Sequence, residues 1–136
     1  IITRTCNNYG SNQHKEKFLP TIIRSIKEEK EVPIYGDGKN VREWIDVKDN
    51  VEQLYNLMLS DLTNETFNIG TGETYTNLDI VGMIGVIMKK PVKFKYVKDR
   101  LGHDRRYSLN SNKLNQYGFA KKYRTLIDFL KKEVQN

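Results

Sequence analysis

The sequence has little cysteine, little proline and no long apolar run, and each shortage excludes a class of protein. One cysteine, Cys6, excludes an internal disulfide framework. No stretch approaches the roughly 18 apolar residues of a membrane-spanning helix, so we expect no membrane partner. Three prolines and no low-complexity tract leave little room for a linker. With 38% hydrophobic residues among 136, the chain is too apolar to be disordered and long enough to bury a core.

The chain also lacks an initiator methionine and a signal-peptide pattern at its start. It opens at Ile1, in residues that we interpret as the end of a buried strand. We therefore expect the chain to be a piece of something longer. The single cysteine favours a reducing compartment such as the cytoplasm, without requiring it.

Residues that could carry chemistry are sparse. Cys6 has no histidine near it in sequence, so a buried apolar role is expected for it. His14 and His103 are isolated, which gives no ligand spacing for a metal site. The turns at 36–38 and 70–72 are rich in glycine but do not match a phosphate-binding fingerprint. The residues alone thus predict no catalytic group and no metal site.

Charge is distributed unevenly. There are 23 lysines and arginines against 17 aspartates and glutamates, a net charge of +6. Residues 89–106 hold eight basic and two acidic side chains, a surplus equal to the whole net charge. Such a segment is either a solvated strand face or a pocket for a small anion such as a diphosphate. Because Val92, Phe94 and Tyr96 alternate with lysines, we expect a strand with these aromatic rings in the core, and no nucleic-acid partner.

Hydrophobic spacing predicts a mixed α/β chain with short strands. Apolar residues recur at helical spacing in 18–30, 49–58, 77–89, 111–117 and 125–134. Strands are predicted at 1–3, 32–35, 41–47, 66–69 and 92–96, with turns at 7–10 and 36–38. The strands at 32–35 and 41–47 are expected to pair as a hairpin.

The caps and buried faces of three helices are also predicted. Asp49 and Glu52 resemble a capping box, Asn77 suits an N-cap, and Thr125 caps the last helix together with Asp128. The expected buried stripes are Val51, Leu54, Tyr55 and Met58, then Leu78, Val81, Ile84 and Ile87, then Leu126, Ile127, Leu130 and Val134.

The densest polar segment is Asp99–Tyr107, which reads Asp-Arg-Leu-Gly-His-Asp-Arg-Arg-Tyr. Arginine offers a planar fork that binds diphosphate oxygens, and a central glycine permits close approach to a ligand. A salt-bridged surface loop would contain the same residues. Arg42 is a second candidate, on the strand face that it shares with Trp44 and Asp46; pairing with Asp46 or Glu43 deserves equal weight.

Several segments in order along the chain resemble the dTDP-glucose 4,6-dehydratases of the extended short-chain dehydrogenase/reductase family. They are Arg4–Gly10, Glu16–Pro20, Pro33–Gly38, Val41–Trp44, Asn68–Gly70 and Asp99–Tyr107. The resemblance implies an α/β fold: the last strands of a Rossmann-like parallel sheet, including 1–3 and 66–69, plus a small mixed α/β substrate-binding domain. Residues 1–136 would be the C-terminal substrate-binding portion, with the N-terminal NAD-binding region absent.

The resemblance also assigns roles to residues of a dTDP-sugar site. Arg42 and Arg100 would hold the diphosphate, and Asn8 would contact NAD. The implied substrate-binding residues are Asn7, Lys17, Phe18, Pro33, Ile34, Tyr35, Arg42, Asn77, Asp99, Arg100, Leu101, Gly102 and His103, of which Pro33, Ile34 and Tyr35 border the thymine. Leu101 replaces a proline usual in the family, and Phe18 replaces a leucine.

The implied enzyme converts dTDP-glucose to dTDP-4-keto-6-deoxyglucose by NAD-assisted oxidation, dehydration and reduction. Its glycine-rich cofactor turn, Tyr-x-x-x-Lys pair and Asp-Glu pair are expected outside the matched segments, so the chain alone should be inactive, with NAD bound mainly elsewhere. The family implies a cytoplasmic homodimer and dTDP-rhamnose-type synthesis; the oligomeric state of this chain stays open. The alternatives are a non-enzymatic nucleotide-sugar-binding module, a related epimerase or dehydratase piece and, last, an RNA-binding protein.

Overall fold

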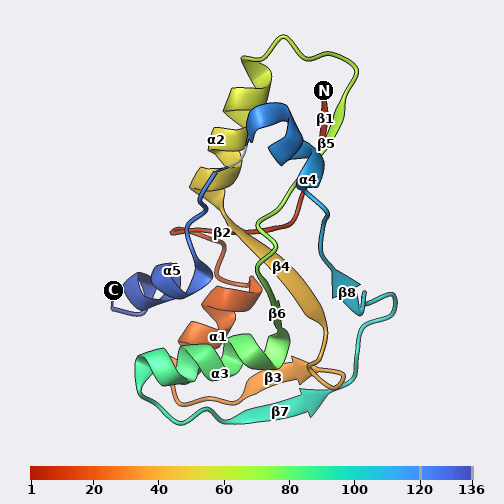
Figure 1. The fold of residues 1–136 in the computed structure, drawn as a ribbon. Coiled ribbons are helices and arrows are strands. Elements are labelled where there is room, and N and C mark those ends of the chain that lie inside the picture. Colours follow the sequence, from red (N-terminus) through yellow and green to blue (C-terminus); the bar gives the residue numbers. More distant parts are fainter. Residues whose placement is uncertain (120, 136) are drawn as a thin grey trace.

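The computed structural model describes residues 1–119 and 121–135, and these form the mixed α/β arrangement predicted (Figure 1). The strands are β1 (Ile2–Thr5), β2 (Asn7–Tyr9), β3 (Val32–Tyr35), β4 (Val41–Asp46), β5 (Thr66–Ile69), β6 (Thr74–Thr76), β7 (Phe94–Val97) and β8 (Arg106–Tyr107). The helices are α1 (Phe18–Lys27), α2 (Val47–Met58), α3 (Asn77–Met88), α4 (Asn112–Leu114) and α5 (Leu126–Glu133), with a wider helical turn at Asn115–Phe119.

Parallel pairing dominates three small sheets. β1 pairs with β5 in parallel, which agrees with the prediction that both belong to a parallel sheet. β4 pairs in parallel with β2 and β8 and antiparallel with β6, while β3 pairs in parallel with β7. Parallel neighbours need long crossover connections, so residues far apart in the sequence meet in every one of these parallel pairs.

Two local predictions about strands are wrong. β3 and β4 do not form a hairpin, because Gly36 and Gly38, at φ of 58° and 70°, lead the chain away and each strand pairs elsewhere. The segment predicted as a turn at 7–10 is instead the strand β2, whose backbone pairs with that of β4. Both errors have one cause, since local turn residues do not reveal a distant strand that offers hydrogen bonds.

β4 contributes to two hydrophobic clusters. Trp44 packs into the cluster of α1, α3, α5 and β3, whereas Ile45 packs into the cluster that holds Cys6, Phe67 and Leu114. Successive side chains of a strand point to opposite faces, so one strand can serve both clusters. The pocket described below lies on the Trp44 side.

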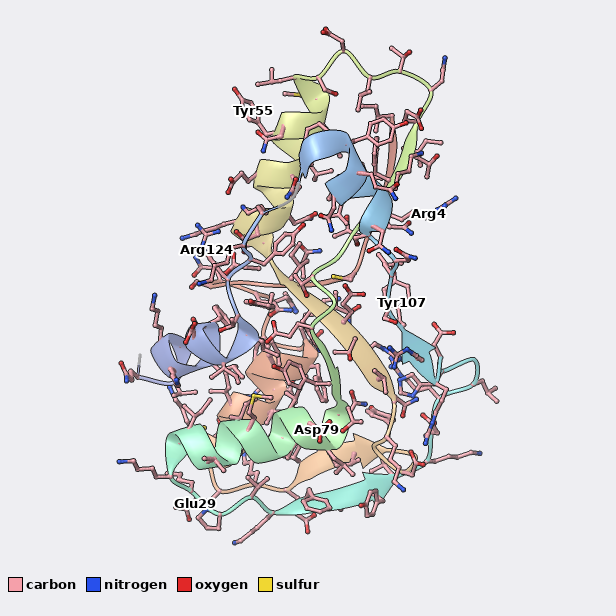
Figure 2. The ribbon with its side chains drawn as sticks, viewed as in Figure 1. Arg4, Glu29, Tyr55, Asp79, Tyr107 and Arg124 are labelled. Atoms are coloured by element: carbon pink, nitrogen blue, oxygen red, sulfur yellow. The ribbon has the colours of Figure 1, made fainter. Side chains whose placement is uncertain are left out.

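Most of the predicted buried face of α2 is wrong, although Leu54 is partly buried against the cluster of Cys6 and Phe67. Val51, Tyr55 and Met58 are 56%, 55% and 69% exposed, and Figure 2 shows Tyr55 on the outer side of the helix. The predicted capping box is also wrong, because the N-cap is Asp46, which accepts a hydrogen bond from the Lys48 N–H. The residues that the helix buries are mostly polar: Asp49, Asn50, Gln53 and Leu57.

The other helices follow their patterns more closely. α3 buries Val81 and Ile84 as predicted, but its N-cap is Thr76 rather than Asn77, with a reciprocal capping box to Asp79. In α5, the Thr125 hydroxyl accepts from the Asp128 N–H, as predicted. Its buried residues include Leu126 and Leu130. In the turn after α4, Gly118 leaves the helical conformation with a φ of 85°. No helix among the described residues is both long and apolar enough to span a membrane.

Edge strands explain two further errors. Phe94 and Tyr96 are 45% and 58% exposed, not in the core as predicted, and they lie on β7, which pairs with β3 alone among the described residues. Ile1 and Ile2 are likewise exposed, because β1 has only β5 as a neighbour. An unpaired strand edge with apolar side chains offers a surface for a further strand.

We expect opposite effects from alanine at the two glycines of α3. A side chain at Gly82 would meet nothing within 4 Å, so Gly82→Ala should raise the free energy of unfolding by up to about 1 kcal/mol through helix propensity. A Cβ at Gly85 would collide with Val92, so Gly85→Ala should lower it by roughly 1–3 kcal/mol. Urea denaturation followed by circular dichroism checks both, and shifts of the same sign would contradict the prediction.

Candidate nucleotide-binding pocket

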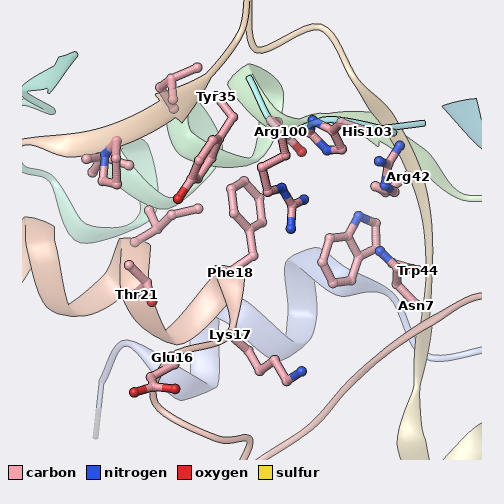
Figure 3. Close-up of a pocket in the computed structure, with 15 residues that line it drawn as sticks. Asn7, Glu16, Lys17, Phe18, Thr21, Tyr35, Arg42, Trp44, Arg100 and His103 are labelled. Atoms are coloured by element: carbon pink, nitrogen blue, oxygen red, sulfur yellow. The ribbon is translucent and has the colours of Figure 1, made fainter. Parts of the chain in front are cut away.

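A cavity of about 410 Å³ opens between the start of α1, strands β3 and β4, and the loop before β8 (Figure 3). Many of its lining residues belong to the predicted site: Asn7, Lys17, Phe18, Pro33, Ile34, Tyr35, Arg42, Asn77, Arg100 and His103. They come from segments as far apart as β2 and residues 100–103. The fold thus gathers these side chains at one place, while their contacts with a ligand stay predictions.

Four predicted site residues do not line this cavity. Leu101 is fully exposed, and Gly102 turns the loop at a φ of 69°. The Asp99 carboxylate is hydrogen-bonded to the Nδ1 of His103 at 2.6 Å. Asn8 lies on β2 next to Asn7 but points to the other face, as strand alternation requires. Its amide nitrogen donates to the Cys6 carbonyl at 3.1 Å.

The contact of Asn8 with NAD stays a prediction, and one observation is compatible with it. The Asn8 Oδ1 is buried and has no hydrogen-bond partner among the described residues, so it could accept from a donor of the cofactor. One side chain cannot hold a dinucleotide, and a glycine-rich cofactor turn is not among the motifs of this sequence. No chemical step is therefore derived through NAD.

Five further residues line the cavity without having been predicted: Glu16, Thr21, Ile22, Val32 and Trp44. Two signals could have found some of them. Thr21 and Ile22 lie about one helical turn beyond Lys17 and Phe18, on the same side of α1. Trp44 shares a strand face with Arg42, two residues earlier.

The cavity has an aromatic wall and a cationic side. Phe18 stacks on Trp44 with ring centroids 6.4 Å apart and planes at 19°. The guanidinium of Arg100 lies over the Tyr35 ring, 5.4 Å from its centroid. An apolar and aromatic surface beside cations suits a ligand with a flat base and an anionic group.

Arg42 is available for an anion. Glu43 is fully buried and accepts from the Gly72 and Leu109 N–H groups at 2.7 and 2.6 Å, while Asp46 caps α2. The proposed pairing of Arg42 with either carboxylate is therefore wrong. Within the described part of the chain, neither Arg42 nor Arg100 forms an ion pair, and Arg42 donates to the carbonyl of the preceding Val41 at 2.8 Å.

The loop that carries Arg100 is held by one carboxylate of its own, Asp99, and by one from the turn after β3, Asp37. Arg105 bonds Asp37 at 2.6 Å, and this hydrogen bond lowers the pKa of Asp37 to about 2. The hydrogen bond from His103 likewise lowers the pKa of Asp99. Part of the loop is thus salt-bridged, as the alternative interpretation held, while Arg100 faces the cavity.

Two groups that could carry catalysis in other proteins, a cysteine thiol and the pattern Tyr-x-x-x-Lys, are not placed for it here. Cys6 is 3% exposed, which confirms its expected buried position, and burial raises the pKa of its thiol to about 12. The pattern Tyr-x-x-x-Lys occurs at 35–39 and 117–121, but in neither case do the two residues lie on one helix. Lys121 forms ion pairs with Asp49 and Glu52. No group of three potential metal ligands lies together in residues 1–119 and 121–135.

Comparison with known proteins identifies the family. The family model described as "NAD dependent epimerase/dehydratase family" matches residues 1–70, which is half of the chain. The chain belongs to this family. Among curated members, the dTDP-glucose 4,6-dehydratase of Haemophilus influenzae is 40% identical over 127 residues, which cover 85% of this chain and 38% of that protein.

Solved structures of family members confirm the predicted α/β fold. The dTDP-glucose 4,6-dehydratase of Bacillus anthracis, in complex with NAD, superimposes with a TM-score of 0.87 at 37% identity, over 98% of this chain and 42% of that one. The UDP-glucose 4-epimerase of Thermotoga maritima, solved with UDP-glucose, gives 0.86 at 28% identity, over 98% and 44%. The chain spans about two-fifths of the length of these relatives.

Proposed function

We propose that this chain is the nucleotide-sugar-binding portion of a dTDP-glucose 4,6-dehydratase. The observation that carries the proposal is a cavity that combines an aromatic wall with two arginines free of carboxylates. A dTDP-sugar presents the matching features, a flat base and a diphosphate. Similarity to dehydratases of this name supports the choice of sugar nucleotide.

In this proposal the residues divide by chemistry. Tyr35, Pro33 and Ile34 border the base, while Arg42 and Arg100 bind the diphosphate, a bidentate task that suits guanidinium groups. Asn7, Lys17, Phe18, Asn77 and His103 complete the contacts along the substrate. The predicted contacts of Asp99, Leu101 and Gly102 would require the loop to close further, since these residues lie outside the cavity.

Catalysis would depend on the remainder of the enzyme. The elimination needs positioned acid and base groups, which we place in that remainder, together with most of the NAD contacts. This chain alone should therefore not convert dTDP-glucose, and turnover by it would contradict the proposal. The free edge of β1 and the exposed apolar face of α2 are where we place contact with that remainder.

Calorimetric titration with dTDP and UDP tests the proposed ligand. The thymine methyl group in a mostly apolar pocket should make dTDP bind roughly 10-fold or more tightly than UDP. A preference for UDP would favour a piece of a related epimerase, and binding of neither would contradict the proposal. Turnover after addition of the remaining part would separate an enzyme portion from a non-enzymatic binding module.

RNA binding is a second candidate because of one observation. Phe94 and Tyr96 are exposed between lysines on an edge strand, an arrangement that can stack single-stranded bases. Affinity for RNA that falls steeply with salt would support it. A cytoplasmic location, a rhamnose-type pathway and a homodimeric full enzyme stay predictions.

A further inference from the structure

The single tryptophan of the chain carries a buried donor without an acceptor. Trp44 is 4% exposed, and its Nε1 is closed to solvent with no hydrogen-bond partner among the described residues. Folding removes such an N–H from water without replacing the lost hydrogen bond, which costs stability. An unsatisfied donor in a native protein requires a reason, and a ligand that supplies the acceptor is one.

The position of Trp44 points to such a ligand. The residue lines the cavity and is paired with Asn7 across β2 and β4. Phe18 stacks on the indole and fixes its plane. Figure 3 shows the indole nitrogen on the side of the ring that faces Arg42 and His103. The donor is thus aimed at the cationic side of the cavity, where an anionic group would be bound.

We infer that the Trp44 Nε1–H donates a hydrogen bond to a phosphate oxygen of the bound nucleotide diphosphate. This inference rests on the proposed function and adds a neutral donor to the two arginines. An indole N–H can only donate, and β4 and Phe18 hold its direction, so it favours an acceptor at one defined point. Trp44 is accordingly a binding residue for the diphosphate and does not contact the base.

Ligand entry would couple Trp44 to Arg42. The indole donor is sealed in the ligand-free protein, so a side chain over it must move. The guanidinium of Arg42 lies on that side and makes one hydrogen bond in the described structure, to the Val41 carbonyl. Movement of Arg42 from this carbonyl to a phosphate oxygen would place the phosphate on the side that the indole donor faces.

Nuclear magnetic resonance gives a direct readout. Because the chain has one tryptophan, ¹⁵N-labelled protein shows one indole N–H resonance. Addition of dTDP should move this proton downfield, as hydrogen bonding to an anionic oxygen does, whereas thymidine, which lacks phosphate, should leave it in place. An indole resonance that is unchanged by saturating dTDP overturns the inference.

Calorimetry with two variants separates the contribution of the indole N–H to dTDP binding from that of the ring's shape. Trp44→Phe should weaken dTDP binding by roughly 10-fold or more, the value of a hydrogen bond to a charged group, and leave thymidine binding unchanged. Benzothienylalanine at position 44 replaces the N–H with sulphur at nearly constant shape, and should give the same loss. It should not lower the melting temperature of the ligand-free protein, because it removes an unsatisfied donor.

Ser111→Ala is the matched control, since Ser111 also carries a buried unpartnered polar atom but lies outside the cavity. It should leave dTDP affinity unchanged. Equal dTDP affinity in the wild type and both position-44 variants would overturn the inference, as would an equal loss for thymidine. If the wild-type protein binds neither dTDP nor thymidine, the proposed function itself fails, which is a distinguishable result.

Discussion

Replacing Asp49 with alanine should lower the free energy of unfolding by about 1.5–3 kcal/mol, the value of hydrogen bonds to a buried charged group. Asp49 is 1% exposed. Its carboxylate accepts from the Lys121 Nζ at 3.1 Å, from the Arg124 N–H at 2.7 Å and from the Arg124 guanidinium. Figure 2 shows Arg124 beside α2. These bonds connect α2 to the segment that leads into α5. A typical free energy of unfolding is about 5–15 kcal/mol, so the expected decrease is a substantial part of it.

Glu52→Ala provides the control for this change. Glu52 also pairs with Lys121, at 2.6 Å, but its side chain is 53% exposed. Exposed ion pairs contribute about 0–1 kcal/mol, so this variant should unfold near the wild-type urea concentration. Similar midpoints for the two variants would show that the buried contacts of Asp49 do not stabilise the fold as argued.

Replacing Arg42 with glutamine should weaken dTDP binding by roughly 10- to 100-fold, since a charged hydrogen bond to phosphate contributes about 1.5–3 kcal/mol. Thymidine binding should change little, because Arg42 is proposed to contact the diphosphate and not the base. The loss should exceed that caused by raised salt alone, since guanidinium and phosphate meet in a fixed geometry. Titration calorimetry measures the affinity for dTDP, the affinity for thymidine and the affinity for dTDP at raised salt.

Arg4→Gln is the matched control for charge. It removes the same charge from an exposed position on β1 (Figure 2), and Arg4 is not among the residues that line the cavity. It should leave dTDP affinity within about twofold, because the Debye length near physiological salt is about 8 Å. An equal loss in both variants would mean that Arg42 acts through net charge and makes no specific contact.

The sequence predicted the helices well because their signals are local. α1, α3 and α5 follow apolar spacing over three or four residues, and the Thr125 cap lies three residues from the group that it satisfies. Most of the cavity was also predictable, although from resemblance to a family and not from spacing. Arg42 and Arg100 lie 58 residues apart in the numbering, and no local rule brings them together.

Errors arose where a choice depended on a distant partner. The apolar side of α2 was expected to face inward, but Asp49 and Gln53 face inward and satisfy the segment around Arg124 and Phe119. A polar group can be buried when another part of the chain provides its hydrogen-bond partners. The spacing of residues in the sequence does not reveal these distant partners. Pairing of β3 with β7, in place of β4, was hidden for the same reason.

By itself, then, the sequence determined a mixed α/β chain without a disulfide framework, most of its helices, and a cationic segment at 89–106. Only the tertiary structure decided where that charge acts: Arg100 faces the cavity, while Arg105 is neutralised by Asp37. It also decided that Trp44 is a buried donor beside Arg42. The physical reason is that burial and pairing depend on groups distant in sequence, which meet only when the strands are in register.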